Sequence, residues 1–534
     1  MRVRTLARTR YAATPFVLRL YLRLERRWIL VWAVSFLTLM YLSVIAMEQA
    51  YPTQEALQAR AGLMSNPAAI MMTGPAFALD DYTFGAMLAN ELSLWTYIPA
   101  AIMSILLAVR RSRGEEETGR LEVLAAMPLG RHAPVAAAAL TVAIANLIVA
   151  AAITLAVASV GVADAFAFGI SAGLTGILFG AVALLCGQMT EHAKTASGLA
   201  FGILGLAVIV RGFGDVIEPT GSWLSWFSPI AWAQQTRLFT DLRWWPLLFT
   251  VSATVIIAGL AMALNARRDL GAGLLPTRSG PASASDFLAT PAGLAVRLLS
   301  GTFVAWSAGL FVFAVAFGSL ATSIDTLLAD NPAIGEWVAI STDDLTLSFA
   351  SVIVSLLALG PLILGCSAIL QLRRDEREGR LSALLTAGFS RLRIYSAWSA
   401  VSSAGAALTM VVMGAGTGLG LFLVTGDASW IASLTFASLA YIPAIVLVCA
   451  LSAAVVGTAA PQSLAWSLIA VIALEVYLGD LLSLPGWLRN LSPIAHTPLV
   501  PYEAPAAAPL TVMAGLAIVL GLLGALSLSR RDID

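Results

Sequence analysis

The stretch RRSRGEEETGRLEVL, residues 110 to 124, carries eight charged residues in its first thirteen positions, although only 12% of the 534 residues in the chain are charged. A related stretch, RRDEREGRLSALL, follows at residues 373 to 385, and seven of its first eight residues are charged. Each stretch lies between two apolar runs that are long enough to cross a membrane. Two such loops in the same setting indicate an internal repeat.

The composition identifies the class of protein. Hydrophobic residues make up 59% of the chain, whereas a soluble domain has about 25% charged residues. A hydrocarbon layer of about 30 Å takes about 20 helical residues to cross, and apolar runs of this length recur along the whole chain. The runs are continuous and do not alternate, which indicates helices rather than barrel strands. We therefore expect an all-α integral membrane protein.

Twelve transmembrane helices are predicted, six in each half of the chain. In the first half they lie at about 28–47, 92–109, 133–160, 165–189, 196–212 and 245–265. In the second half they lie at about 300–322, 346–370, 394–424, 430–457, 461–479 and 507–528. The uncharged run from 428 to 474 is too long for one crossing, and the turn-like GTAAPQS at 457–463 divides it.

Four motifs recur in the same order in the two halves. They are TPFVLRL at 14–20 with TPAGLAVRL at 290–298, GRL at 119–121 and 379–381, SPIA at 228–231 and 492–495, and RRD at 267–269 and 530–532. Because six spans return the chain to its starting side, the two repeats are parallel and one chain is a pseudo-dimer. We expect a first six-helix repeat over 1–270, a linker rich in Pro, Gly and Ser over 271–297, and a second repeat over 298–534.

Arginine positions predict the orientation, since short cytoplasmic loops are enriched in basic residues. With a cytoplasmic N-terminus, the cytoplasmic segments hold 26 of the 31 basic residues. We therefore expect both termini in the cytoplasm and a multi-pass protein of the plasma (inner) membrane. The first apolar run follows 27 residues rich in arginine and is as long as a span, so it is interpreted as a retained anchor, not a cleaved signal peptide.

Motifs for catalysis and metal binding are missing from the sequence. A phosphate-binding loop requires GxxxxGK[ST], and the only lysine is Lys194, in EHAKTASG. The cysteines Cys186, Cys366 and Cys449 all fall inside predicted spans, where buried thiols are the simplest interpretation. We expect no catalytic residue, no metal and no cofactor in this chain, and no nucleic-acid partner.

The charged loops lie between the second and third spans of each half. In each, an acid precedes an arginine by four residues, Glu116 with Arg120 and Glu376 with Arg380, a spacing that supports a short helix through an ion pair. One interpretation is a solvated loop that fixes the orientation through its arginines. Mixed charge at two symmetric places instead favours a docking surface for a partner with complementary charge.

The stretch RRSRGEEETGRLEVLAAMPLGR resembles the coupling-helix region of ABC-2-type exporter permeases, in which that helix sits in a groove of a cytoplasmic ATPase. Together with RRDLGAGLLPTRSGPA, SPIAWAQQT and the twelve spans, it resembles the actinobacterial branch of polyketide-antibiotic and multidrug exporters. The resemblance covers essentially the whole chain. In the second loop Arg377 and Glu378 replace Glu117 and Thr118, so the two sites differ.

This resemblance implies a permease that exports hydrophobic or amphipathic compounds together with two copies of a separate ABC ATPase, which bind the ATP and Mg. It implies contact with the ATPase through nine residues: Glu115, Glu116, Gly119, Arg120, Leu121, Glu376, Gly379, Arg380 and Leu381. The alternative is an ion-coupled secondary multidrug transporter, but such proteins carry intramembrane acids or histidines, and the spans offer little besides Arg211 and Glu475. An intramembrane enzyme would need paired catalytic residues, which the spans lack.

Arg211 and Glu475 each precede the serine of an SPIA motif by seventeen residues, so they are pseudo-symmetry mates. One hypothesis is that they form an outer gate across the pseudo-twofold axis. The other is that Arg211 extends to the outer interface while Glu475 meets loop groups. Two other sets of residues have two interpretations each. Phe36, Met40 and Trp95 of the first two spans either line a cavity or pack in the core. On the predicted outer side, GSWLSWFSPIAW at 221–232 forms either interfacial helices with an aromatic belt or, as in the resembling exporters, a re-entrant lid.

Overall fold

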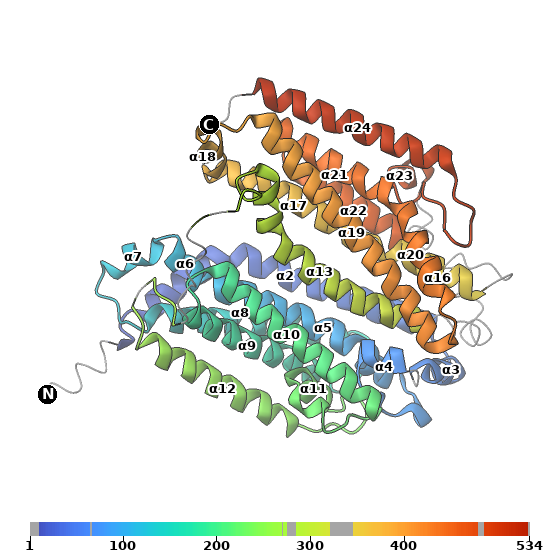
Figure 1. The fold of residues 1–534 in the computed structure, drawn as a ribbon. Helices are drawn as coiled ribbons and strands as arrows, with labels where there is room; N and C mark the ends of the chain where they lie inside the picture. Colours follow the sequence, from blue (N-terminus) through green and yellow to red (C-terminus); the bar gives the residue numbers. More distant parts are fainter. Residues whose placement is uncertain are drawn as a thin grey trace. The chain divides into compact units, whose positions relative to one another are not determined.

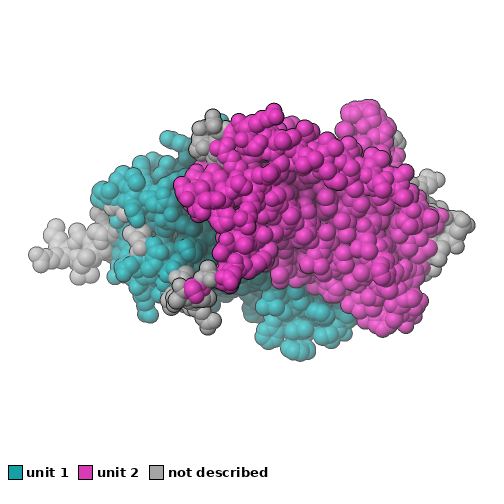
Figure 2. Space-filling model, turned by 45° about the horizontal axis from the view of Figure 1, so that its top comes forward, with its two compact units in different colours: residues 1–279 teal, residues 280–534 magenta. Residues whose placement is uncertain are grey.

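The computed structural model describes residues 10–64, 67–269, 271–274, 283, 285–320, 345–478 and 485–531. Within these ranges every regular element is a helix, which confirms the all-α prediction. The chain divides into two compact units, Met1–Ser279 and Gly280–Asp534, coloured separately in Figure 2. The boundary between the units falls inside the predicted linker.

Six long helices form the first unit, and the shorter ones lie in the connections between them (Figure 1). The long helices are α2 (Thr14–Ala50), α5 (Phe84–Arg110), α8 (Ala133–Ala158), α9 (Ala165–Met189), α10 (Ala193–Ile217) and α12 (Pro246–Asn265). The shorter ones are α3 (Gln54–Met64), α4 (Pro67–Thr73), η1 (Leu79–Asp81), α6 (Arg113–Glu117), α7 (Arg120–Ala125), η2 (Ser225–Phe227) and α11 (Pro229–Gln234).

The second unit repeats this order with more interruptions. Within the described residues its helices are α13 (Pro291–Ser319), α16 (Leu345–Leu357), α17 (Leu359–Arg377), α18 (Arg380–Thr386), α19 (Arg391–Thr425), α20 (Ser429–Ser438), η4 (Leu439–Tyr441), α21 (Ile442–Gly457), α22 (Ser463–Leu478), α23 (Gly486–Arg489) and α24 (Ala507–Arg530). The predicted division of the long uncharged run is confirmed, because α21 ends at Gly457 and α22 begins at Ser463.

Eleven helices within the described residues are long and apolar enough to cross a membrane. The twelfth predicted span corresponds to α22, an apolar helix that the structure describes from Ser463 to Leu478. The chain is a multi-pass membrane protein. The helix ends follow local rules: Thr83, Thr290 and Ser390 cap α5, α13 and α19 through their side-chain oxygens, which satisfy backbone N–H groups of the first turn.

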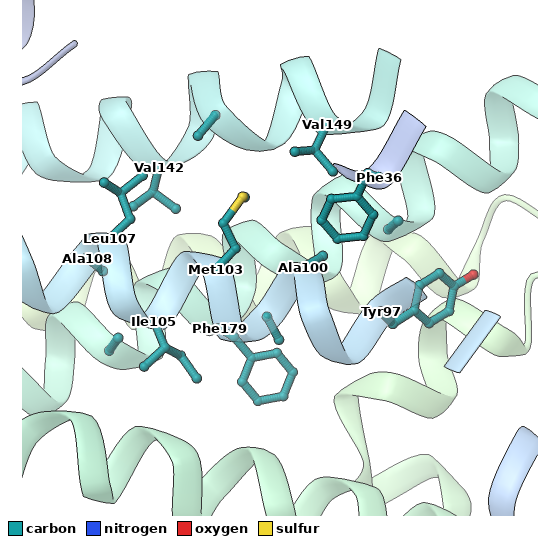
Figure 3. Close-up of a cluster of buried hydrophobic side chains, with 14 of the residues drawn as sticks. Phe36, Tyr97, Ala100, Met103, Ile105, Leu107, Ala108, Val142, Val149 and Phe179 are labelled. Atoms are coloured by element: carbon teal, nitrogen blue, oxygen red, sulfur yellow. The ribbon is translucent and has the colours of Figure 1, made fainter. Parts of the chain in front are cut away.

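The core of the first unit forms around α5 and α9, which pack against each other and against neighbouring helices. Figure 3 shows Phe36 of α2, Met103 of α5 and Phe179 of α9 in this buried cluster. Met40 also belongs to the cluster, whereas the side chain of Trp95 is half exposed. Phe36 and Met40 therefore pack in the core, which is the second of the two roles considered for them.

The second unit is held together by close packing between long helices. The helix α19 lies along α13, and α21 lies along α24. A Cβ atom added at Gly457 would stand 2.2 Å from the carbonyl oxygen of Gly524, so this pair needs glycine. Small residues allow such approach in a membrane, where burial of apolar surface between helices adds little.

Candidate functional site

The charged stretches form two short turns of helix that we call the elbows, residues 113–125 in the first unit and 373–385 in the second. The first elbow contains α6 and α7. The second contains the end of α17 and all of α18 except its last residue, Thr386. Each elbow bends at a glycine in the left-handed region, Gly119 with φ +71° and Gly379 with φ +73°. Open space surrounds both glycines, so the backbone angle, not crowding, calls for glycine. The predicted short helix is therefore interrupted in both copies.

The predicted ion pairs between residues four apart do not form, because the glycine bend separates their two ends. Arg120 and Arg380 instead each face the acid five residues before them. The Nη1 atom of Arg120 lies 3.9 Å from Oε1 of Glu115, and Nη2 of Arg380 lies 2.5 Å from Oδ1 of Asp375. Hydrogen bonds from Arg380 to Asp375 raise the pKa of this guanidinium, so it stays charged.

Glu116 instead sits between two arginines, and we call Arg113, Glu116 and Arg268 the first clamp. Arg113 donates through Nη1 to Oε2 of Glu116 at 2.8 Å. Arg268, which follows α12, donates to both oxygens of the same carboxylate, with Nη1 at 2.8 Å from Oε2. All three side chains are at most 3% exposed. A buried carboxylate shared by two guanidiniums is a strong, geometrically defined contact.

The second unit repeats this arrangement, and we call Arg373, Glu376 and Arg531 the second clamp. Nη1 of Arg373 lies 3.2 Å from Oε2 of Glu376, and Nη2 of Arg531 contacts Oε1 of Glu376. These side chains are 11% to 19% exposed, more than those of the first clamp. Each clamp joins its elbow to the end of the last long helix in its unit.

The first elbow has a further connection. Glu25 of α2, which is 1% exposed, accepts hydrogen bonds from Arg111 Nε at 2.7 Å and Arg110 Nη1 at 3.1 Å. The corresponding positions of the second unit are Leu370 and Gln371, which cannot make this pair of ion pairs. Arg111 lies just before the elbow and also contacts Oε1 of Glu115 through Nη1 at 2.5 Å. The first elbow is therefore linked to α2 by charge through Arg111, and the described part of the second unit has no such link.

The elbows have a buried face and an exposed face. Leu121 and Leu381 are buried beneath them, at 6% and 5% exposure. On the outside, the side chain of Arg120 is 70% exposed and that of Arg380 is 55% exposed, and Val123 of the first elbow is 74% exposed. The acids Glu115 and Glu116 face inward, whereas Arg120 and Arg380 face outward.

Arg211 lies within the first unit and is completely buried, so it does not extend to an interface. Its Nη1 atom is 3.3 Å from Oδ2 of Asp215, one turn further along α10. It also donates to the carbonyl oxygens of Ile70 and Met71 in α4, and Ser225 donates to Oδ1 of Asp215 at 2.6 Å. This network joins α10 to α4 and η2.

Glu475 lies on α22 in the other unit, and its Oε2 atom is buried without a hydrogen-bond partner among the described residues. The gate between Arg211 and Glu475 stays a prediction. On the same predicted side, residues 221–232 contain the short helices η2 and α11, as expected. Trp226 stacks on Trp245 with ring centroids 5.3 Å apart, whereas Trp223 is 71% exposed.

Cysteine, histidine and acidic side chains form no group of three or more that could hold a metal ion in the part of the chain that the structure describes. The three cysteines are buried free thiols.

The clamp arginines and Asp215 are functional candidates that the sequence alone did not indicate. In the sequence the RRD motif marks the repeat, whereas the structure shows that its second arginine occupies the clamp in both units. The predicted fifth span ends at residue 212, before Asp215, whereas α10 continues to Ile217. In both cases the signal was present, as a repeated arginine after the last span and as an acid four residues after Arg211.

Comparison with known proteins covers nearly the whole chain. Residues 288–528 match the family described as multidrug efflux system permease Rv1217c, C-terminal domain. The chain is also 32% identical, over 536 aligned positions, to the multidrug efflux system permease protein Rv1217c of Mycobacterium tuberculosis. The alignment covers 98% of this chain and 96% of that protein.

Proposed function

The chain belongs to the family of multidrug efflux system permeases, and we propose that it is the membrane subunit of an ATP-driven exporter. Two copies of a separate cytoplasmic ABC ATPase bind at the two elbows, one copy at each. The ATPase supplies the sites for ATP and Mg, because this sequence has no phosphate-binding loop. The exported compounds are hydrophobic or amphipathic, such as drugs or polyketide antibiotics.

The observation that carries this proposal is the elbow that occurs twice. Both copies follow the second long helical segment of their unit, both bend at a left-handed glycine, and both expose an arginine that lies beside a buried acid. A solvated loop that only sets orientation needs basic residues but not this shape. Exposed, oriented charge on a rigid bend suits a partner with complementary acidic groups.

The elbows also suggest how the partner drives transport. Closure of an ATPase dimer would move both elbows, and each elbow is continuous with a long helix, α5 in one unit and α17 in the other. Movement of these helices changes which side of the membrane the substrate path faces, a rigid-body switch between two states. No residue of this chain takes part in bond breaking.

The arginine distribution supports a cytoplasmic location for the elbows, the linker and both termini, where an ATPase has access to them. The membrane is the plasma (inner) membrane. Phe36 and Met40 are buried in the first unit, so we do not assign substrate contacts to them.

Copurification tests this function directly. A tagged copy of the chain should retain an ATPase from its own cells, and drugs should stimulate ATP hydrolysis by the purified complex. Arg120→Glu combined with Arg380→Glu should reduce both retention and stimulation, whereas Arg243→Glu, an exposed arginine on the opposite predicted side, should change neither. Export that needs no ATPase and stops when the proton gradient is collapsed would instead support the ion-coupled transporter.

A further inference from the structure

The two clamps connect parts of each unit that are distant in sequence. Glu116 and Arg268 are separated by 152 residues, and Glu376 and Arg531 by 155. One member of each pair belongs to the elbow and the other follows the last long helix, α12 or α24. The same contact in two repeats with different surrounding residues indicates that the contact itself is required.

The first clamp gathers several elements around one carboxylate. Arg268 also donates through Nε to Oε1 of Gln188 at 2.6 Å, and Arg113 donates through Nε to the carbonyl oxygen of Gly187 at 2.9 Å. Gln188 and Gly187 lie at the end of α9. The clamp therefore fixes the elbow against the ends of both α9 and α12.

The second clamp is the looser of the two. The Nε atoms of Arg373 and Arg531 have no hydrogen-bond partner among the described residues, and the clamp is more exposed than the first. A third arginine, outside the clamp, supports it. Arg391, at the start of α19, donates to the carbonyl oxygen of Arg531. Arg131 makes the same contact with the carbonyl oxygen of Arg268 in the first unit.

We propose that each clamp makes the elbow and the last long helix of its unit move as one body, with Arg268 and Arg531 as the positioning residues. Motion imposed on an elbow then reaches α12 or α24 directly, in addition to the helices that are continuous with the elbow. The proposal rests on the proposed function for the source of the motion. The connection that each clamp makes between the elbow and the last long helix, which we call the joint, is a property of this chain alone.

The RRD motif supplies its own control. In both copies the first arginine, Arg267 or Arg530, is exposed and makes no ion pair within the described residues, while the second lies in the clamp. Arg268→Gln and Arg267→Gln therefore remove the same charge from adjacent positions, as do Arg531→Gln and Arg530→Gln. Only the first variant of each pair opens a clamp.

The decisive measurement is the number of substrate molecules transported per ATP hydrolysed by the complex in lipid nanodiscs or vesicles. Arg268→Gln and Arg531→Gln should lower this ratio roughly 2-fold to 30-fold, the range for residues that carry coupling between sites, and Arg267→Gln and Arg530→Gln should leave it unchanged. A variant that was only poorly folded would lose transport and hydrolysis together and keep the ratio. Equal ratios in all four variants would overturn the proposal.

Charge exchange tests the pair itself. The second clamp is the better place for it, because its partial exposure tolerates a rearranged pair. Arg531→Glu alone should lower the ratio, and adding Glu376→Arg should restore part of it. Failure of the exchange to exceed both single variants would contradict a direct role for the pair.

Hydrogen exchange on the permease without ATPase separates this proposal from the proposed function. Amides of residues 113–125 should exchange faster in Arg268→Gln than in Arg267→Gln, whether or not an ATPase binds. If no ATPase copurifies but this difference appears, the joint stands and the proposed function fails. If an ATPase copurifies and the difference is missing, the joint fails alone.

Discussion

Arg211 and Asp215 show how single buried charges are accommodated in this protein. Both side chains are completely buried, and they lie four residues apart on one face of α10. Arg211 has additional carbonyl acceptors in α4, and Asp215 accepts a hydrogen bond from Ser225. Burying two charges is costly even when they pair, and removing only one partner is far more costly because the other stays buried and uncompensated.

We predict that Asp215→Ala lowers the free energy of unfolding by about 3–5 kcal/mol. The double variant Arg211→Met with Asp215→Leu should lose clearly less, since it leaves no unpaired charge. Arg243→Ala removes an exposed pair with Asp241 and should cost at most about 1 kcal/mol. Denaturant unfolding in mixed micelles measures all three. An Asp215→Ala effect as small as that of Arg243→Ala would show that the buried pair does not stabilise the fold.

At the scale of the elements, side chains join helices at their ends. The start of α8 meets the end of α12, where Arg131 donates through Nε to the carbonyl oxygen of Asn265 at 3.2 Å. Beside it, Nδ1 of His132 lies 3.1 Å from Nδ2 of Asn265. Because an amide nitrogen only donates, His132 accepts this bond through an unprotonated Nδ1. Burial, then the charges of Arg10 and Arg131, lower the pKa of His132.

This contact predicts a loss of stability at acidic pH. The folded state holds His132 neutral, whereas the unfolded chain takes up a proton near pH 6.5. Stability from this group is therefore complete above about pH 6.5 and is lost as the pH falls through the lowered pKa. The melting temperature in detergent should fall between pH 7.5 and 5.5, and His132→Gln should flatten part of that fall. His496→Gln, at an exposed position, should not; an equal flattening by both variants would refute the assignment.

At the scale of the whole molecule, the two repeats carry different connections. The first elbow is tied to α2 through Glu25 and to α10 through Glu117, which accepts a hydrogen bond from the N–H of Ala193 at 3.0 Å. In the second elbow Arg377 stands in place of Glu117. The side chains of the second clamp are also more exposed than those of the first. The two halves therefore share an architecture, but their elbows expose two unequal surfaces.

The orientation of the whole chain can be tested by cysteine labelling. In a variant with Cys186, Cys366 and Cys449 replaced by alanine, Arg243→Cys should react with an impermeant maleimide on intact cells. Arg267→Cys should react only after the membrane is permeabilised, because the positive-inside rule places it in the cytoplasm. Both arginines are at least partly exposed. Labelling of residue 267 on intact cells would reverse the predicted topology.

The sequence by itself determined the elements, because their signals are local. Continuous apolar runs predicted helices that the structure contains at all twelve places, with α9 beginning at Ala165 and ending at Met189 as predicted. The repeated GRL motif located both elbows, since a glycine that must adopt a left-handed angle is visible in the sequence as a glycine.

Only the tertiary structure decided which charges meet. The spacing along a helix predicts an ion pair between Glu116 and Arg120. Because the chain bends at Gly119, Arg120 lies beside Glu115 instead, and Glu116 pairs with Arg268, 152 residues away. The same exchange of partners occurred in the second unit through Gly379. Helical periodicity reports neighbours within one or two turns, whereas ion pairs between helix ends depend on how whole helices pack. That packing is set by close fits such as Gly457 against Gly524, which no local pattern records.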